Sequence, residues 1–124
     1  MKLQPDKSGT PSITAYGPGW VALLGERFNN SIVIGSRGER IHWNCTNFSA
    51  LTLAHFESIA ELEPELLIFG SGRSLVFPEP HWLSPLANRR IGIETMDTQA
   101  ACRTYNILAA EGRHVIAALL LDEN

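Results

Sequence analysis

The sequence lacks the features that would assign it to a membrane or nucleic-acid-binding class. Its longest unbroken apolar run, Val115–Leu121, has seven residues, far below the roughly 18 to 20 that a membrane-spanning helix requires. The 124 residues carry ten basic and thirteen acidic side chains, a net charge of −3, so we expect no basic face for a nucleic acid. We therefore predict no membrane insertion and no nucleic-acid partner.

Cysteine is scarce, with only Cys45 and Cys102. Residues 1–11 have no apolar core of a secretory signal, and we expect them to form a disordered tail before a single domain over residues 12–124. We therefore predict two reduced thiols in a cytoplasmic protein rather than a disulfide. Cys102 falls in the first turns of an expected helix, where a thiolate gains some stabilisation, but packing in the core is the favoured role.

Motifs for metal binding and for covalent or nucleotide chemistry are also missing. His42 and Cys45 have a His-x-x-Cys spacing, but no fourth ligand stands at a plausible distance along the chain, so we predict no metal and no cofactor. Ser71 is not the centre of a Gly-x-Ser-x-Gly elbow. Leu75 stands where a dinucleotide-binding fingerprint needs its third glycine.

The sequence does contain several short apolar runs that are typical of a buried sheet. Leu66–Phe69 leads directly into Gly70-Ser71-Gly72, which reads as a strand covered on both faces and followed by a turn. Two more runs follow, Ile91–Glu94 and His114–Leu121, each after a helix-like segment, the first of which is Pro80–Asn88. The second half is therefore predicted to be a β-α-β-α-β unit of mainly parallel strands.

The first third of the chain predicts an antiparallel meander of three or four strands. The expected strands are Ser12–Tyr16, Trp20–Leu24, Ser31–Ile34 and Arg40–Asn44. The segments that connect them are too short for the crossovers that parallel strands need. Together with the second half, this meander predicts an α/β fold built as a single domain.

Helix ends are marked by residues with suitable side chains or backbone freedom. Thr46 or Asn47 is expected to cap the first helix, since each offers a side-chain oxygen to the unpaired amides, and Pro64 ends it. The last helix is expected to begin after Asp97 and to end at Gly112, where left-handed backbone geometry is common.

Polar residues at the carboxyl ends of two strands form the candidate site, because open α/β sheets bind ligands there. Gly70-Ser71-Gly72 offers backbone amides to an anion and allows close approach. Two simpler readings stay open, in which this segment is only a tight turn and Glu94 caps a helix or pairs with an arginine. The candidate crevice consists of Gly70, Ser71, Gly72, Arg73, Glu94, Thr95, Met96, Arg103 and Asn106.

Several stretches within residues 12–121 together resemble a known family of small α/β domains. They are residues 13–17, 31–34, 66–72, 94–98 running on to 104–108, and 111–115. They are similar to the domain shared by mitochondrial respiratory complex I assembly factor 3 and the adipogenesis-associated domain proteins. That family typically has Gly-Thr-Gly where this chain has Gly70-Ser71-Gly72. The resemblance implies a three-layer β/β/α fold, no established catalytic residue or cofactor, and, from the assembly-factor branch, protein binding near respiratory membrane complexes.

These observations support two function hypotheses of different classes. The favoured one is a non-enzymatic binding or assembly protein in the cytoplasm, whose partner is a component of a respiratory or other membrane complex. The alternative is a protein or enzyme that holds a small anionic ligand in the candidate crevice. A weaker hypothesis is a subunit whose sheet edge pairs into a homodimer. An exposed apolar patch away from the crevice would favour the first hypothesis, and a concave pocket at the crevice the second.

Overall fold

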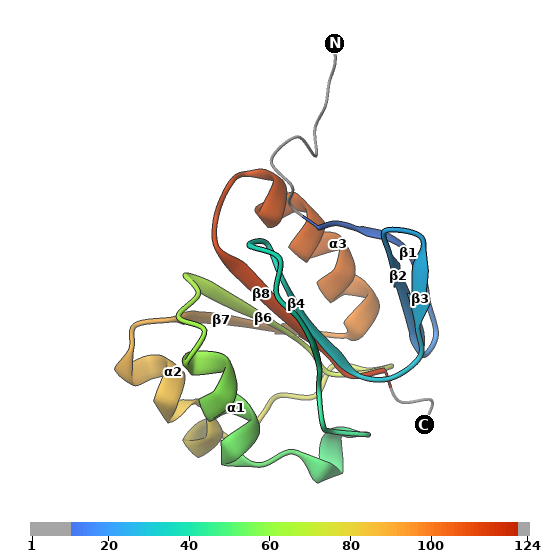
Figure 1. The fold of residues 1–124 in the computed structure, drawn as a ribbon. Coiled ribbons are helices and arrows are strands. Elements are labelled where there is room, and N and C mark those ends of the chain that lie inside the picture. Colours follow the sequence, from blue (N-terminus) through green and yellow to red (C-terminus); the bar gives the residue numbers. More distant parts are fainter. Residues whose placement is uncertain (1–10, 122–124) are drawn as a thin grey trace.

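The computed structural model describes residues 11–121 and contains two β-sheets with helices packed against them (Figure 1). The tail expected over residues 1–11 lies outside the described residues apart from Pro11. The smaller sheet is antiparallel and has three strands in sequence order. They are β1 (Ile13–Gly17), β2 (Trp20–Leu23) and β3 (Glu26–Phe28).

The larger sheet has five strands in the order β5-β4-β8-β6-β7. Its strands are β4 (Ile32–Gly35), β5 (Arg40–His42), β6 (Leu66–Gly70), β7 (Gly92–Met96) and β8 (Val115–Leu119). β6 pairs in parallel with both β7 and β8, as the predicted β-α-β-α-β unit requires. β4 pairs antiparallel with β5 and with β8, so it joins the two halves of the chain.

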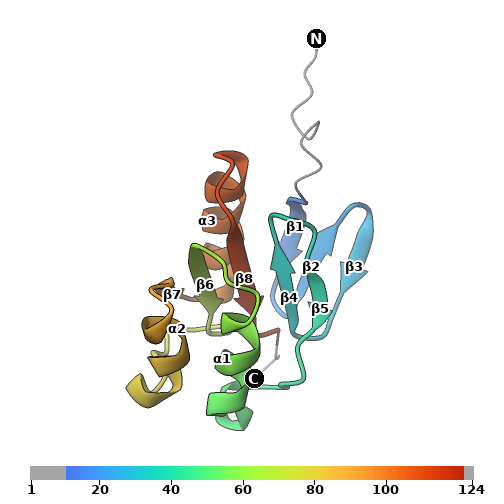
Figure 2. The ribbon, with the colours of Figure 1, turned by 60° about the vertical axis from the view of Figure 1, so that its left-hand side comes forward.

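The helices and the smaller sheet cover the larger sheet from both sides. Helix α3 (Thr98–Ala110) and the smaller sheet lie on one face, and α1 (Leu53–Ala60) and α2 (Ser84–Asn88) lie on the other (Figures 1 and 2). Two short 3-10 helices, η2 (Phe48–Ala50) and η3 (Pro80–Leu83), precede α1 and α2. The α/β fold predicted from the sequence is confirmed, with α3 sharing one layer with the smaller sheet.

The predicted meander is antiparallel, but its strands divide between two sheets. All four residues of Ile32–Gly35 are buried, and a strand buried on both faces belongs inside the larger sheet rather than in an exposed hairpin. Glu26–Phe28 lies in a predicted connection between strands, but it forms β3. Its two exposed charged residues left no apolar run by which the sequence would reveal a strand.

The first helix begins later than predicted, while the last begins where its cap was expected. Asn47 precedes η2 without a side-chain cap bond, and α1 starts after Thr52, whose N–H donates to Nδ1 of His55 at 3.0 Å. Thr46 and Asn47 therefore do not cap α1. Asp97 does cap α3, because its Oδ1 accepts from the N–H of Ala100 at 2.9 Å.

The core has two halves, one on each face of the larger sheet. Cys102 and Tyr105 of α3 are fully buried in one half, and Trp43 and Trp82 belong to an aromatic cluster in the other. Cys45 and Cys102 are both buried, and no disulfide joins them. Burial raises the pKa of the Cys102 thiol to about 12, so this thiol is protonated at neutral pH and packs in the core.

The buried thiol predicts that the free energy of unfolding falls as the pH rises above about 9. Burial raises the pKa of Cys102 from 9.0 to about 12, so the unfolded chain loses this proton at a pH where the folded protein keeps it. The stabilisation is complete below pH 9 and is lost towards pH 12, by at most about 1.4 kcal/mol per pH unit. Urea unfolding of wild type and Cys102→Ala across this range measures the effect. Identical pH slopes for the two proteins would contradict it.

Candidate functional site

The two loops of the candidate crevice come together, as the sequence analysis required. The N–H of Ser71 donates to the carbonyl of Met96 at 2.9 Å, and the N–H of Thr98 donates to the carbonyl of Gly72 at 2.9 Å. The loop after β6 therefore lies directly against the end of β7 and the start of α3. The ladder bond to Met96 also explains why β7 runs on to Met96 instead of ending at Glu94.

Two of the three amides in Gly70-Ser71-Gly72 are used inside the protein. Besides the Ser71 bond, the N–H of Gly72 donates to Oγ1 of Thr98 at 2.8 Å. Gly70, the third residue, belongs to β6 and is paired with strands on both sides. The Thr98 hydroxyl in turn donates to the carbonyl of Leu120 at 2.8 Å. A side chain at Gly70 would stand 3.0 Å from Cα of Thr98, so glycine permits this close approach of loop and helix. An anion at this site would have to be held mainly by side chains.

The Ser71 hydroxyl shapes the segment that follows. It donates to the carbonyl of Ser74 at 2.7 Å and accepts from the N–H of Val76 at 3.0 Å. The buried hydroxyl thus holds the loop in a conformation that turns apolar side chains outward. Leu75 is 53% exposed, Val76 38% and Phe77 68%. We call residues 75–77 the apolar loop.

A cavity of about 390 Å³ lies between the start of α3 and the β1–β2 turn. Gly72, Arg73 and Arg103 of the predicted set line it. Arg103 donates from Nη1 to the Tyr16 hydroxyl at 3.1 Å, and this hydrogen bond raises the pKa of Arg103 further above its usual value. Asp97 brings a carboxylate to the same cavity, which opposes the binding of an anion.

The remaining predicted residues do not line this cavity. Glu94 and Thr95 lie within β7 rather than after it, and the Glu94 side chain is exposed. Met96 packs against the core on the α3 face. Asn106 is a structural clamp, because Oδ1 accepts from the N–H of Ile13 and Nδ2 donates to its carbonyl, both at 2.8 Å. This side chain fastens β1 to α3.

The site offers little for acid–base or metal chemistry. The buried pair of His114 and Glu39, with Nε2 and Oε2 2.7 Å apart, lies at the amino end of β8, away from the apolar loop. Among residues 11–121, no three His, Cys, Asp or Glu side chains are grouped to hold a metal ion. Within the same range, no helix has the length and apolar character needed to span a membrane. The residues after β6 do provide an ordered apolar loop and, separately, a cavity lined by Arg73 and Arg103.

Sequence reasoning missed the apolar loop as a functional feature. The signal was present, since Leu75-Val76-Phe77 is followed by Pro78-Glu79-Pro80. An apolar run next to two prolines cannot join a regular ladder, and no amphipathic helix pattern covers it. Its exposure followed from the Ser71 hydrogen bonds, which the sequence does not show.

The profile of one protein family, described as "Protein of unknown function (DUF498/DUF598)", matches residues 13–120. Among curated relatives, NADH dehydrogenase (ubiquinone) 1 alpha subcomplex assembly factor 3 of Bos taurus is 35% identical over 82 residues, covering 64% of this chain and 45% of the bovine protein. The same-named protein of Danio rerio is 29% identical over 124 residues, covering 95% of this chain and 68% of its own length. The chain thus spans about half the length of the bovine relative.

A solved structure shares the whole fold. The crystal structure of a Bordetella parapertussis protein is 39% identical, with a TM-score of 0.85, and the match covers 91% of this chain and 97% of that one. The resemblance drawn from residues 12–121 is therefore confirmed at the level of sequence family and of fold.

The structural role of Asn106 can be tested by truncation. We expect Asn106→Ala to lower the free energy of unfolding by about 1–3 kcal/mol, because it leaves the N–H and carbonyl of Ile13 without their partner. Asn88→Ala, at an exposed position on α2, should change it by less than about 0.5 kcal/mol. Urea unfolding of both variants provides the comparison. Equal stabilities would show that Asn106 is not a clamp.

Proposed function

The chain belongs to the DUF498/DUF598 family of proteins of unknown function, and we propose that it is a binding protein that helps to assemble a respiratory membrane complex. The proposal extends to this chain the role named in its curated relatives, which are assembly factors of an NADH dehydrogenase. In this proposal the protein acts from the cytoplasm, carries out no catalytic step, and binds a protein component of the complex.

The apolar loop is the observation that carries the proposal. Leu75 and Phe77 each expose more than half of their side chain, and consecutive exposed apolar residues are characteristic of surfaces that become buried on binding. Because Ser71 already holds the loop in place, docking costs little conformational entropy. We propose an apolar patch as the matching surface of that partner.

The proposal can be tested by gene replacement in the source organism. We expect deletion to lower the amount of assembled NADH dehydrogenase on native gels, and the wild-type gene to restore it. The double variant Leu75→Asp/Phe77→Asp should fold but lose co-purification of the complex subunits by about tenfold or more, as expected for loss of central apolar contacts.

The matched control is Ile107→Asp on α3, which places the same charge at another apolar residue that is 62% exposed. This variant should behave like wild type. Normal amounts of assembled NADH dehydrogenase in the deletion strain would overturn the proposed function. If the double variant co-purifies the complex subunits as well as Ile107→Asp does, the apolar loop is not the docking surface.

The cavity lined by Arg73 and Arg103 favours a second function. At about 390 Å³ it has the size of a metabolite site, and two guanidinium groups suit carboxylate or phosphate. As the alternative, we propose that a small anionic ligand binds here.

A thermal-shift series with citrate, inorganic phosphate and adenosine triphosphate tests the alternative. Binding should raise the unfolding midpoint in wild type, by an amount that grows with the logarithm of ligand concentration once that concentration exceeds Kd. The shift should vanish in Arg73→Gln/Arg103→Gln. It should persist in Arg113→Gln, whose arginine pairs with Glu65 at 3.2 Å at the other end of the sheet. The absence of any shift at millimolar ligand would argue against an anion site.

A further inference from the structure

Within residues 11–121 the larger sheet ends at β5, whose outer edge has no paired strand. In the described part of the chain β5 pairs only with β4, and Arg40, Ile41 and His42 are all exposed. An open edge presents main-chain donors and acceptors that another extended chain can use. Most proteins cover or block such an edge, and this one leaves it beside a groove.

The ladder to β4 determines which main-chain groups of β5 face outward. The N–H of Trp43 donates to the carbonyl of Ser31 at 3.0 Å, so these two residues form a hydrogen-bonded pair. Such pairs alternate along an antiparallel ladder, so Ile41 also bonds to β4. Arg40 and His42 therefore turn their N–H and carbonyl groups towards the open edge.

A groove of about 400 Å³ runs between this edge and α1. The side chain of Ile41 shares a face with that of its cross-strand neighbour Val33, which packs in the core on the α1 side. Ile41 is 44% exposed, and it forms one wall of the groove. Ala54 and Leu62 of the α1 segment contribute to the other wall, and Trp43 also lines the groove.

Hydrogen bonds fix the geometry of the groove. Because Nδ1 of His55 accepts from the N–H of Thr52, Nε2 carries the proton and donates to the carbonyl of Asn44 at 2.7 Å. This bond ties the chain just after β5 to helix α1. The indole ring of Trp43 packs edge-on against His55, with ring centroids 5.9 Å apart.

The indole N–H of Trp43, a residue that lines the groove, is a donor without a hydrogen bond in the described part of the chain. Its Nε1 is buried and has no acceptor among residues 11–121. A buried donor without a partner is destabilising, so the interior next to the groove is not fully satisfied in the unbound protein. An open edge, an apolar groove and an unpaired donor thus meet around Trp43.

We propose that the groove between β5 and α1 binds an extended segment of a partner protein. The segment adds to β5 as an antiparallel strand and places one large apolar side chain beside Ile41, between β5 and α1. Main-chain bonds from Arg40 and His42 then supply affinity and the groove supplies specificity, as in other strand-addition sites. This inference does not depend on the proposed assembly function.

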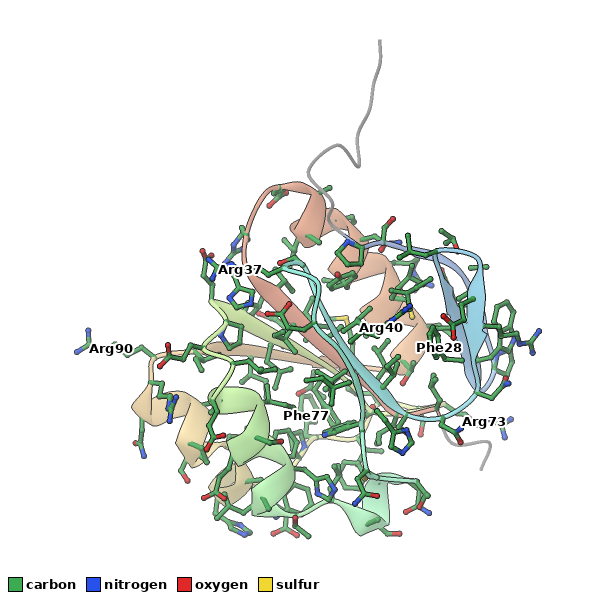
Figure 3. All side chains as sticks on the ribbon, in the orientation of Figure 1. Phe28, Arg37, Arg40, Arg73, Phe77 and Arg90 are labelled. Carbon is green, nitrogen blue, oxygen red and sulfur yellow. The ribbon has the colours of Figure 1, made fainter. Side chains whose placement is uncertain are left out.

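Charge and area favour this occupant over a second copy of the chain. The residues that line the groove include no carboxylate, and the neighbours of the apolar anchor would lie over the face that carries Arg40. Figure 3 shows Arg40 next to Phe28 at this edge, 5.3 Å from guanidinium carbon to ring centroid. Nη1 of Arg40 also lies 3.5 Å from a carboxylate oxygen of Glu26, but a guanidinium has five N–H donors, so it can pair with an acidic neighbour in the segment as well. A three-residue edge contributes little of the roughly 1,600 Å² that a stable protein interface buries.

A synthetic peptide on the full chain tests the site. The probe is a fluorescein-labelled heptapeptide, Thr-Val-Asp-Leu-Asp-Val-Thr, whose leucine lies beside Ile41 and whose aspartates pair with Arg40 and His42. We expect saturable binding by fluorescence anisotropy. N-methylation of both aspartates should weaken binding by about tenfold or more, because their N–H groups face β5. N-methylation of the leucine, whose N–H faces away, should change it less than about twofold.

Two matched substitutions test the groove on the protein side. Ala54 and Ala87 are both exposed on helices, but only Ala54 lines the groove. Ala54→Arg should fill the groove and weaken the binding of the peptide by about tenfold or more. Ala87→Arg should bind the peptide as tightly as wild type. The proposal is overturned by no saturation below about 1 mM, by equal binding of both variants, or by equal binding of the two methylated peptides. It is also overturned if wild type forms a dimer that Ile41→Asp dissolves, since a second copy would then occupy the edge.

Discussion

The structure depends above all on covering β8 on both faces and along both edges. Every residue from Val115 to Leu119 is fully buried, and β8 lies between β4 and β6. A strand with no polar face must have apolar layers on both sides. The chain supplies α3 and the smaller sheet on one side and α1 and α2 on the other (Figure 2). The antiparallel β4 is recruited from the first third of the chain because β8 needs a second neighbour.

The same close packing determines which groups of the loop after β6 remain available to a ligand or partner. One hydroxyl, that of Thr98, accepts from the N–H of Gly72 and donates to the carbonyl of Leu120, so it joins the ends of two strands to the start of α3. The amides that the sequence offered for an anion are largely used in this joint. The loop is thereby ordered, and it presents apolar side chains to the solvent instead of amides.

Much of the fold could be predicted because the buried strands are short continuous apolar runs. The strands Leu66–Gly70 and Val115–Leu119 are predicted by such runs. The capping side chain of Asp97 indicates the start of α3. Local patterns could not reveal β3, which is polar, or the pairing of β4 with β8, which depends on contacts far apart in the sequence. The cap at Thr52 was missed because η2 occupies the position where the helix was expected.

The order of the elements predicted which two loops meet, but not which of their hydrogen-bonding groups stay available. Parallel strand order places the ends of β6 and β7 side by side, and that follows from the pattern of elements alone. Which donors and acceptors remain available to a ligand depends on individual hydrogen bonds. The side chain of Asn106 bonds to the main chain of β1, and the hydroxyl of Ser71 bonds within its own loop. The described part of the chain exposes apolar side chains at residues 75–77 and an open strand edge beside α1. Covering either of them with a second surface lowers the free energy, because the apolar side chains leave water and the edge gains main-chain hydrogen-bond partners. The proposed binding functions rest on these two features.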